Sequence, residues 1–402
     1  MNILLITMVN IKDIRERGIY HDLMRSFIKK GHSVYVVSPA ERRSGEATSL
    51  TSSDNCSLLR VKIGNIQKTN LIEKGITTLT LERKIKRAIN KYFTNVKFDA
   101  VLYSTPPITL CKVIEYIKKR DGAFAYLMLK DIFPQNAVDL GIFSKKSPFY
   151  VYFHRKEKKL YKISDMIGCM SEANVKYLLN HCESIVKGKI EVCPNGEEPQ
   201  DTDIIRSKRE ETRLKYGLPL DARIFVYGGN IGLPQGAEFI IDVLKAFNGD
   251  KKNYFVIPGA GTEYGKIEKY RNASGQENLL LLPFLPYEEY STLLSASDVG
   301  LIFLDHRFTI PNFPSRILTY MQSYLPVIAA TDSATDIGYV IESGDFGYRC
   351  DSGDVSAFKA IIDGLSEDEL IEKGKNARKY FEEHYTADAV CDIILKSTEN
   401  SL

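Results

Sequence analysis

Short β-rich runs alternate with longer amphipathic segments through most of the chain, and this alternation occurs twice. In the first half, strands are expected at residues 3–6, 33–37, 61–63, 100–103, 123–129, 166–169 and 190–193. The second half repeats the pattern at residues 224–227, 254–257, 279–282, 299–304, 327–330 and 347–350. Such alternation is typical of βαβ units with parallel strands and helices on both faces. The sequence therefore predicts an α/β fold with two doubly wound, Rossmann-like domains.

A polar, charge-mixed stretch from residue 197 to 215 follows Asn195-Gly196 and separates the two halves. A length of 402 residues suits two domains of ordinary size. We expect an N-terminal domain over residues 1–198 and a C-terminal domain over residues 199–383. Ligands of open α/β sheets bind beyond the carboxyl ends of the strands, so we expect the site in the cleft between the domains.

Composition narrows the class of protein. Hydrophobic residues make up 44% and charged residues 26% of the chain, which is typical of a soluble globular protein. A net charge of +3 is too small to indicate a nucleic-acid partner. Seven cysteines without a CxxC pair, no leader-like segment and no apolar window of membrane-spanning length favour the cytoplasm. The six histidines show no metal-ligand spacing, so no metal and no cofactor are expected.

One loop in the second half predicts an anion site. Residues 310–318 lie between two apolar runs and read as strand, ordered loop and helix start. Pro314 suits a first helical turn, and Asn312 or Ser315 could cap free backbone amides. Arg316 would add a fixed charge to a helix start that already favours anions. An ordinary strand-to-helix loop with one solvated arginine is the alternative.

Three further segments follow expected strands of the second half. Residues 228–236 are glycine-rich and run into an amphipathic helix, but they match neither a P-loop nor a dinucleotide fingerprint. Glycines there would let the backbone approach a ligand, although an ordinary βα turn is equally plausible. Residues 258–261 form a second, weaker turn of this kind. Residues 283–287 could place an apolar wall beside a nucleobase, with core packing of Phe284 as the alternative.

The first half offers candidates of another kind. Gly18 follows the first expected strand, where a small residue permits close backbone approach. Asp131 follows a later strand directly and could orient or deprotonate an acceptor hydroxyl, or could cap a turn. Basic and aromatic residues interleave over 83–93 and 145–162, a pattern that fits contact with an anionic membrane or a solvated helix face.

Taken in order, these segments resemble the retaining glycosyltransferases of family four, which have the GT-B fold, and among them the O-antigen and capsule enzymes of the WbuB/CapL type. The matching pieces are residues 31–34, 104–109, 130–134, 194–196, 228–236, 258–261, 284–286, 314–318 and 326–328. Members often carry an acidic pair where this chain has Pro311 and Thr319. Many also have Arg and Lys where Asn230 and Gln235 stand.

The resemblance implies a sugar donor linked to UDP, held mainly by the C-terminal domain, and a final helix over residues 384–402 that crosses back to the N-terminal domain. The implied acceptor is a polyprenyl-diphosphate-linked saccharide at the inner face of a bacterial plasma membrane. The catalytic candidates are Asp131 and Arg316. The donor-binding candidates are Gly18, Gly229, Asn230, Gly232, Gln235, Gly259, Gly261, Phe284, Leu285, Asn312, Pro314, Ser315, Arg316 and Ile317. A nucleotide-sugar epimerase and a non-catalytic nucleotide-sugar-binding scaffold are the alternatives.

Overall fold

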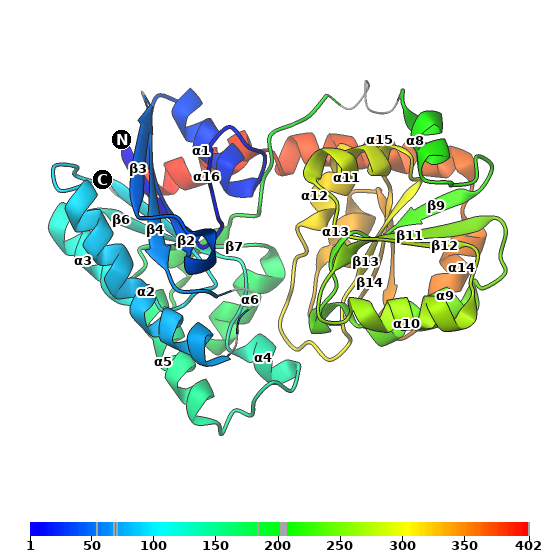
Figure 1. Ribbon diagram of the computed structural model, residues 1–402, viewed down its shortest axis with the longest axis horizontal. Helices are drawn as coiled ribbons and strands as arrows, with labels where there is room; N and C mark the ends of the chain where they lie inside the picture. The colour runs from blue at the N-terminus through cyan, green and yellow to red at the C-terminus, as the bar shows by residue number, and fades with distance from the viewer. Residues whose placement is uncertain (54, 67–68, 70, 183–184, 202–206, 401–402) are drawn as a thin grey trace. The chain divides into compact units, whose positions relative to one another are not determined.

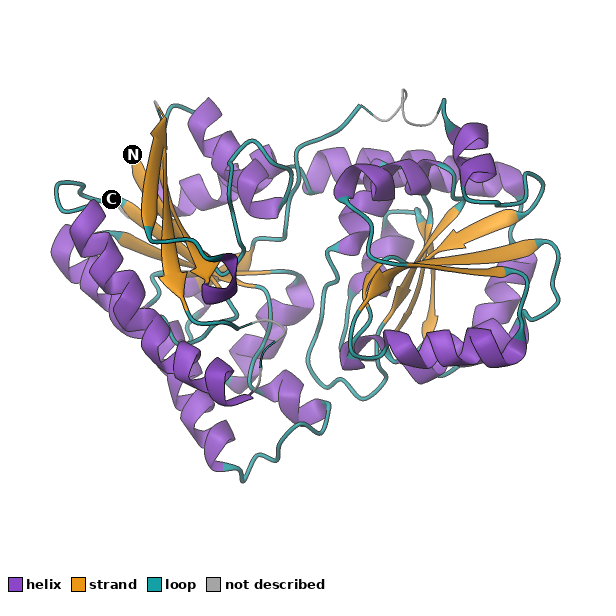
Figure 2. Ribbon diagram, viewed as in Figure 1, coloured by secondary structure: helices purple, strands orange, loops and turns teal. Residues whose placement is uncertain are grey.

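The computed structural model describes residues 1–402 except 54, 67–68, 70, 183–184, 202–206 and 401–402. The chain divides into two compact units, the first formed by Met1–Glu198 with Ala387–Leu402 and the second by Pro199–Thr386. In each unit, helices cover both faces of a largely parallel sheet (Figures 1 and 2). Two Rossmann-like α/β units are therefore present, as the alternation of strands and helices predicts.

The sheet of the first unit has eight strands within the described residues, in the order β3-β4-β2-β1-β5-β6-β7-β8. The strands are β1 (Asn2–Ile6), β2 (Ser33–Glu41), β3 (Ser49–Ser53), β4 (Cys56–Ile63), β5 (Ala100–Ser104), β6 (Phe124–Leu129), β7 (Met166–Cys169) and β8 (Ile190–Val192). All pair in parallel except β3, which runs antiparallel to β4. Strand β3 escapes sequence analysis because all five of its side chains are exposed and show no apolar pattern.

Helices cover both faces of this sheet. They are α1 (Ile19–Lys29), α2 (Leu71–Tyr92), α3 (Cys111–Asp121), α4 (Gln135–Asp139), α5 (Pro148–Ile163), α6 (Glu172–His181) and α16 (Ala387–Glu399), with short turns η1 (Arg42–Ser44) and η2 (Lys187–Lys189). The α16 residues Cys391 and Ile394 join Phe27 of α1 in one buried core against the sheet. Figure 1 shows α1 and α16 together on one side of the strands. The last helix of the chain is thus part of the first unit.

The second unit contains a sheet in the order β10-β11-β9-β13-β14-β15, with β12 paired to β11, as far as the described residues show. The strands are β9 (Arg223–Val226), β10 (Gly229–Asn230), β11 (Asn253–Ala260), β12 (Leu279–Leu282), β13 (Val299–Phe303), β14 (Val327–Thr331) and β15 (Gly347–Asp351). Because β11, β9 and β13 are parallel neighbours, their carboxyl ends meet at one edge of the sheet. The loops that follow these strands therefore share that edge.

The surrounding helices are α8 (Arg209–Lys215), η3 (Leu233–Gln235), α9 (Ala237–Ala246), α10 (Tyr264–Ser274), α11 (Tyr287–Ser295), α12 (Arg316–Gln322), α13 (Ile337–Ser343), α14 (Val355–Gly364) and α15 (Glu367–His384). The main core lies between the sheet and α9, α10 and α14, with Phe225, Phe303 and Phe358 at its centre. A smaller core beneath α11 includes Ile224 and Leu293. This packing makes the sheet edge a rigid base for its loops.

Candidate active site

Arg316, the first residue of α12, lies against the glycine-rich turn that follows β9. Its guanidinium carbon is 4.3 Å from the centre of the Tyr227 ring, and its Nη2 donates to the carbonyl of Asn230 at 3.2 Å. Its Nη1 is buried and has no hydrogen-bond partner within the described residues. None of the ion pairs found among those residues includes Arg316.

A buried, unpaired donor on a permanently charged group is costly, because the group has lost water without gaining an anion. A guanidinium keeps its charge at any physiological pH, so it cannot relieve the cost by losing a proton. The sequence predicts Arg316 at an anion site, and the structure shows a cation with one buried donor that has no hydrogen-bond partner within the described residues. A phosphate or diphosphate oxygen has the charge and geometry that such a donor needs.

Three tyrosines surround Arg316. Tyr227 and Tyr320 are almost fully buried, and Tyr320 accepts a hydrogen bond from the Gly228 amide at 3.3 Å while its own hydroxyl donates to the Leu301 carbonyl at 3.1 Å. Burial raises the pKa of Tyr227 to about 12, and the neighbouring Arg316 cation opposes that rise. Burial also raises the pKa of Tyr290 well above its usual value. All three rings therefore stay neutral and leave the charge of Arg316 uncompensated.

The glycines of this edge let two turns pack directly on one another. A Cβ atom at Gly259 would lie 2.4 Å from the carbonyl oxygen of Gly229, and one at Gly261 would lie 2.2 Å from that of Ile231. Gly229 and Gly261 also have φ values of 108° and 147°, which side chains rarely adopt. Sequence analysis assigned Gly259 and Gly261 to close approach of a ligand. In the structure they pack against the preceding turn, which fixes the Asn230 carbonyl that holds Arg316, and the ligand contact stays a prediction.

Gln235 and Gly232 form a local cap. The Gln235 side chain accepts a hydrogen bond from the Gly232 amide at 2.8 Å, at the start of the short turn η3. Gly232 itself follows the Asn230 position in the same turn and has an extended conformation. This bond uses the Gln235 Oε1 acceptor, so the predicted contact of Gln235 with the sugar donor would have to come from its Nε2 group. Its present role is to shape the turn.

The loop before α12 is fixed by the loop after β14. The Asn312 amide donates to Thr335 Oγ1 at 3.1 Å, and that hydroxyl donates to Asp332 at 2.9 Å. Asp332 also accepts the amides of Ala334 and Thr335, each at 2.9 Å. Sequence analysis did not find Asp332 or Thr335, because no spacing links them to the loop that they hold.

The α12 start differs in detail from the prediction. Helix α12 begins at Arg316, so Pro314 precedes the helix, and Ser315 stands at the N-cap without a side-chain capping bond. Of the two predicted capping residues, Asn312 or Ser315, Ser315 makes no side-chain capping bond. The Ile317 amide donates to the Pro314 carbonyl at 3.3 Å, and the Ile317 side chain is fully buried. Ile317 thus anchors the helix through its side chain, and its predicted contact with the donor stays a prediction.

Phe284 and Leu285, in the apolar segment after β12, have different surroundings. Phe284 is 69% exposed, whereas Leu285 packs beside Leu218 and Leu293 in the smaller core. Core packing was the alternative considered for Phe284, and its exposure excludes that alternative. An exposed ring at the loop edge of the sheet can stack on a flat ligand group, while Leu285 fixes the loop.

In the first unit, Gly18 immediately precedes α1 and has a φ of 148°. Its amide donates to Asp22 at 3.2 Å, so that amide already has a partner, and a Cβ atom would lie 2.9 Å from the His21 ring. Asp131 follows β6 and is exposed, and Thr105 holds its backbone by donating to its carbonyl at 3.1 Å. The Asp131 carboxylate therefore remains accessible for the acceptor role that the sequence predicts.

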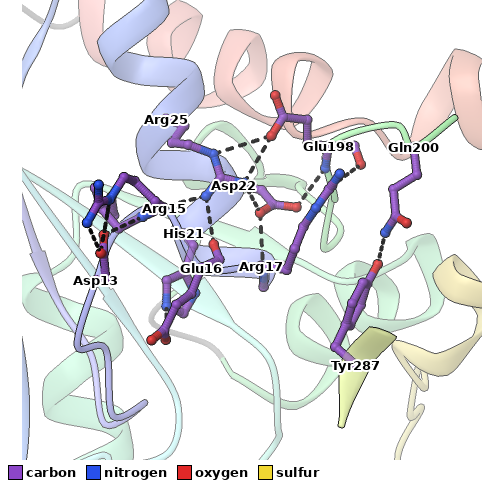
Figure 3. A network of polar contacts seen from close by, with 12 residues as sticks. Asp13, Arg15, Glu16, Arg17, His21, Asp22, Arg25, Glu198, Gln200 and Tyr287 are labelled. Atoms are coloured by element: carbon purple, nitrogen blue, oxygen red, sulfur yellow. Dashed lines mark hydrogen bonds and ion pairs between the residues drawn. The ribbon is translucent and has the colours of Figure 1, made fainter. Parts of the chain in front are cut away.

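Asp22 belongs to a polar network that joins the Gly18 turn to Glu198, where the first long segment of this unit ends (Figure 3). Asp22 accepts the Glu198 amide at 2.8 Å and an Arg25 donor at 2.5 Å. Arg25 also contacts the Glu198 carboxylate at 2.9 Å and the carbonyls of Ile14 and Glu16, both at 2.7 Å. This network holds the backbone around Gly18 in one conformation.

Within the residues that the structure describes, no cluster of His, Cys, Asp or Glu could hold a metal ion. None of the described helices is both long enough and apolar enough to cross a membrane.

Comparison with solved structures identifies the class to which this architecture belongs. Sucrose-phosphate synthase (tll1590) from Thermosynechococcus elongatus superimposes with a TM-score of 0.76 at 14% identity, covering 100% of this chain and 98% of that one. An Escherichia coli trehalose-6-phosphate protein bound with UDP-2-fluoro glucose gives 0.71 at 10% identity, covering 98% and 99%. The two Rossmann-like units therefore form the GT-B fold.

Sequence comparison then identifies the enzyme class. Residues 208–384 match the family described as glycosyl transferases group 1. A Pseudomonas aeruginosa protein described as "Probable glycosyltransferase WbjE" is 25% identical over 293 residues, which are 72% of this chain and 71% of WbjE. An Escherichia coli protein described as "Putative colanic acid biosynthesis glycosyl transferase WcaI" is 24% identical over 183 residues, which are 45% of this chain and 42% of WcaI. The chain carries a glycosyl transferases group 1 domain and is a glycosyltransferase.

Proposed function

We propose that this glycosyltransferase moves a sugar from a UDP-sugar to a polyprenyl-diphosphate-linked saccharide in the synthesis of a bacterial surface polysaccharide. The description of WcaI, which names colanic acid biosynthesis, supports the pathway class, and that of WbjE supports the enzyme class. Donors with an N-acetylated aminodeoxy sugar are the first to test. The observation that carries the proposal is the buried Nη1 of Arg316, which has no partner within the described residues.

The proposed reaction retains the configuration of the anomeric carbon. The bond from that carbon to the donor phosphate oxygen breaks, and a bond to the acceptor oxygen forms on the same face. The proton of the acceptor hydroxyl passes to the departing phosphate oxygen, which becomes more basic as the bond breaks. Negative charge grows on the diphosphate in the transition state, so a fixed cation aimed at it lowers the barrier. Arg316 is assigned that role, and the exposed Asp131 is assigned to orient the acceptor hydroxyl.

We also propose that the protein contacts the inner face of the bacterial plasma membrane peripherally through its first unit. Helix α5 begins at Pro148 with the Ser147 hydroxyl as its cap, and Phe149, Val151 and Tyr152 are 68%, 41% and 39% exposed. The basic residues that the sequence shows on the same helix can lie on anionic headgroups while these side chains enter the interface. Glu157, Leu160 and Tyr161 are the buried residues of this helix, so their side of it faces the unit.

Kinetics of Arg316→Ala test the proposed role. Loss of one charged donor to a developing diphosphate should lower kcat about tenfold or more, and Arg316→Lys should recover part of that loss. Incubation of the UDP-sugar without acceptor, followed by nuclear magnetic resonance, tests for an epimerised sugar. The assignment fails if Arg316→Ala turns over within about threefold of the wild type, a loss too small for a transition-state contact. UDP binding without any acceptor-dependent release of UDP would favour a binding scaffold instead.

A further inference from the structure

The first unit contains a cavity of about 580 Å³ beside the carboxyl end of β4. Lys62 and Ile63 at the end of β4 line one side, Arg42 of η1 contributes from the end of β2, and α2 closes the other side. Residues 73, 76, 77, 80 and 84 of α2 line the cavity, and this spacing places them on one helix face. The carboxyl edge of a parallel sheet is the usual place for a ligand.

The cavity has an excess of positive charge. Its only acidic lining residue among those described is Glu73, and that carboxylate is already bonded to Arg42 at 2.8 Å, the Asn65 side chain at 2.9 Å and Thr69 at 2.7 Å. The hydrogen bond from Thr69 is the main cause that lowers the pKa of Glu73, so it stays ionised with its charge directed to these partners. Lys62 and Lys84 have no carboxylate within 4.0 Å in the described part of the chain.

Apolar side chains continue from the cavity to the surface of α2. Ile76 lines the cavity and is 58% exposed, and Leu79, one turn further along, is 69% exposed. The lining residues that the structure describes include no aromatic ring on which a base could stack. Free cations beside exposed aliphatic groups fit an amphiphile that has a phosphate head and a hydrocarbon chain.

We propose that this cavity binds the phosphate group of a polyprenyl-linked acceptor, with Lys62 and Lys84 on the phosphate and the prenyl chain over Ile76 and Leu79. This inference rests on the proposed function, because it places the lipid portion of the acceptor. It gives α2 a role different from that of α5: recognition of one lipid, in contrast to general contact with an anionic membrane. Arg42 is ion-paired to Glu73, so the positive charge available to a ligand comes from Lys62 and Lys84.

Flotation of the full chain with vesicles tests the site. The vesicles would contain phosphatidylcholine alone, phosphatidylcholine with polyprenyl phosphate, or phosphatidylcholine with a matched charge of phosphatidylglycerol. The double variant K62A/K84A should lose about tenfold or more of its affinity for polyprenyl phosphate vesicles, because each lysine near an anionic headgroup contributes several-fold. The variant R83A/R87A removes the same charge from exposed positions on α2 outside the cavity and should stay within about threefold of the wild type.

Equal losses in the two double variants would overturn the proposal, because they would indicate diffuse attraction to a basic helix. It is also overturned if the wild type binds phosphatidylglycerol vesicles as tightly as polyprenyl phosphate vesicles. Thermal unfolding of K62A/K84A, followed by circular dichroism, should match that of the wild type and shows that the substituted unit is folded. Specific binding of polyprenyl phosphate by a wild type that transfers no sugar would support the site and reject the proposed function. Undiminished transfer to a lipid-linked acceptor by K62A/K84A would support the proposed function and reject the site.

Discussion

Two arginines, one in each unit, show how the surroundings of a charged side chain separate a structural role from a chemical one. Arg25 contacts the carboxylates of Asp22 and Glu198 and two backbone carbonyls (Figure 3). Arg316 donates to one carbonyl, lies over the Tyr227 ring and has a buried nitrogen without a partner in the described residues. Both sit in the first two turns of a helix at the loop edge of a parallel sheet.

The difference lies in the acidic partners. The first unit places Asp22 one turn before Arg25 and brings Glu198 to the same point, so Arg25 and its partners are neutralised within the fold. The second unit surrounds Arg316 with tyrosines whose hydroxyls stay protonated, because burial raises the pKa of each one. An arginine neutralised by the fold stabilises it, whereas one without an anion remains available to a ligand.

The largest expected effect comes from substitution of Arg25. Arg25→Met should lower the free energy of unfolding by about 3–5 kcal/mol, because it leaves the buried Asp22 carboxylate without its cation. The matched variant Arg316→Met should change stability by less than about 1 kcal/mol, since it removes a charge that no anion in the fold compensates. Urea unfolding followed by circular dichroism measures both. Similar losses in the two variants would contradict the distinction between these arginines.

A smaller effect is expected at Tyr227, which we regard as a positioning residue for Arg316. Tyr227→Leu should raise KM for the UDP-sugar by about threefold to tenfold, because a cation over a buried ring gains about 0.5–2 kcal/mol. Tyr227→Phe keeps the ring and removes a hydroxyl that has no hydrogen-bond partner in the described residues, so its KM should stay near that of the wild type. Because Tyr227 is buried, its substitution can lower stability. Both variants should therefore be assayed well below their unfolding temperatures.

The two Tyr227 variants distinguish a ring that only orients Arg316 from a hydroxyl that binds the sugar donor directly. If the ring only orients Arg316, phenylalanine restores activity and leucine does not. If phenylalanine impairs the enzyme as much as leucine, the hydroxyl itself binds the sugar donor, and the role of Tyr227 as a positioning residue is wrong.

The sequence was sufficient for the fold because every buried strand carries its own apolar run. The strands that lie in the two cores were all predicted, but β2, β4 and β11 are longer than predicted: β4 was expected at residues 61–63 and spans Cys56–Ile63. Exposed β3 and the two-residue β10 were not predicted, since one has no apolar pattern and the other depends on the pairing of Gly229 with Gly259. Local pattern identifies elements that bury apolar surface and misses those that form through partners distant in sequence.

The site was less predictable for the same reason. Arg316 could be found because it stands at a strand-to-helix junction with a recognisable sequence. The residues that determine its environment, Tyr227 and Tyr290 among them, come from other elements and look like ordinary core tyrosines in the sequence. The packing roles of Gly259 and Gly261 likewise depend on carbonyls some 30 residues earlier in the chain. Sequence shows which residues could bind an anion, and only their partners in space decide which of them has a free donor.

The smallest expected effect concerns His21, which lies beside the Arg25 network and is buried with its Nε2 lacking a hydrogen-bond partner in the described residues. Burial lowers the pKa of His21 below its usual 6.5. The unfolded chain therefore binds a proton near pH 6.5 that the folded chain does not, and stability is lost as the pH falls below that value.

Urea unfolding from pH 8 to pH 5 tests this. The free energy of unfolding should decline less steeply with falling pH for His21→Gln than for the wild type, by a fraction of about 1.4 kcal/mol per pH unit. Identical slopes would mean that His21 takes up its proton in the folded state, and that Glu16, 3.9 Å away, then serves as its partner. Buried without a partner, His21 can stay neutral, whereas Arg316 keeps its charge. An unpaired buried donor therefore indicates a ligand only where the charge is permanent.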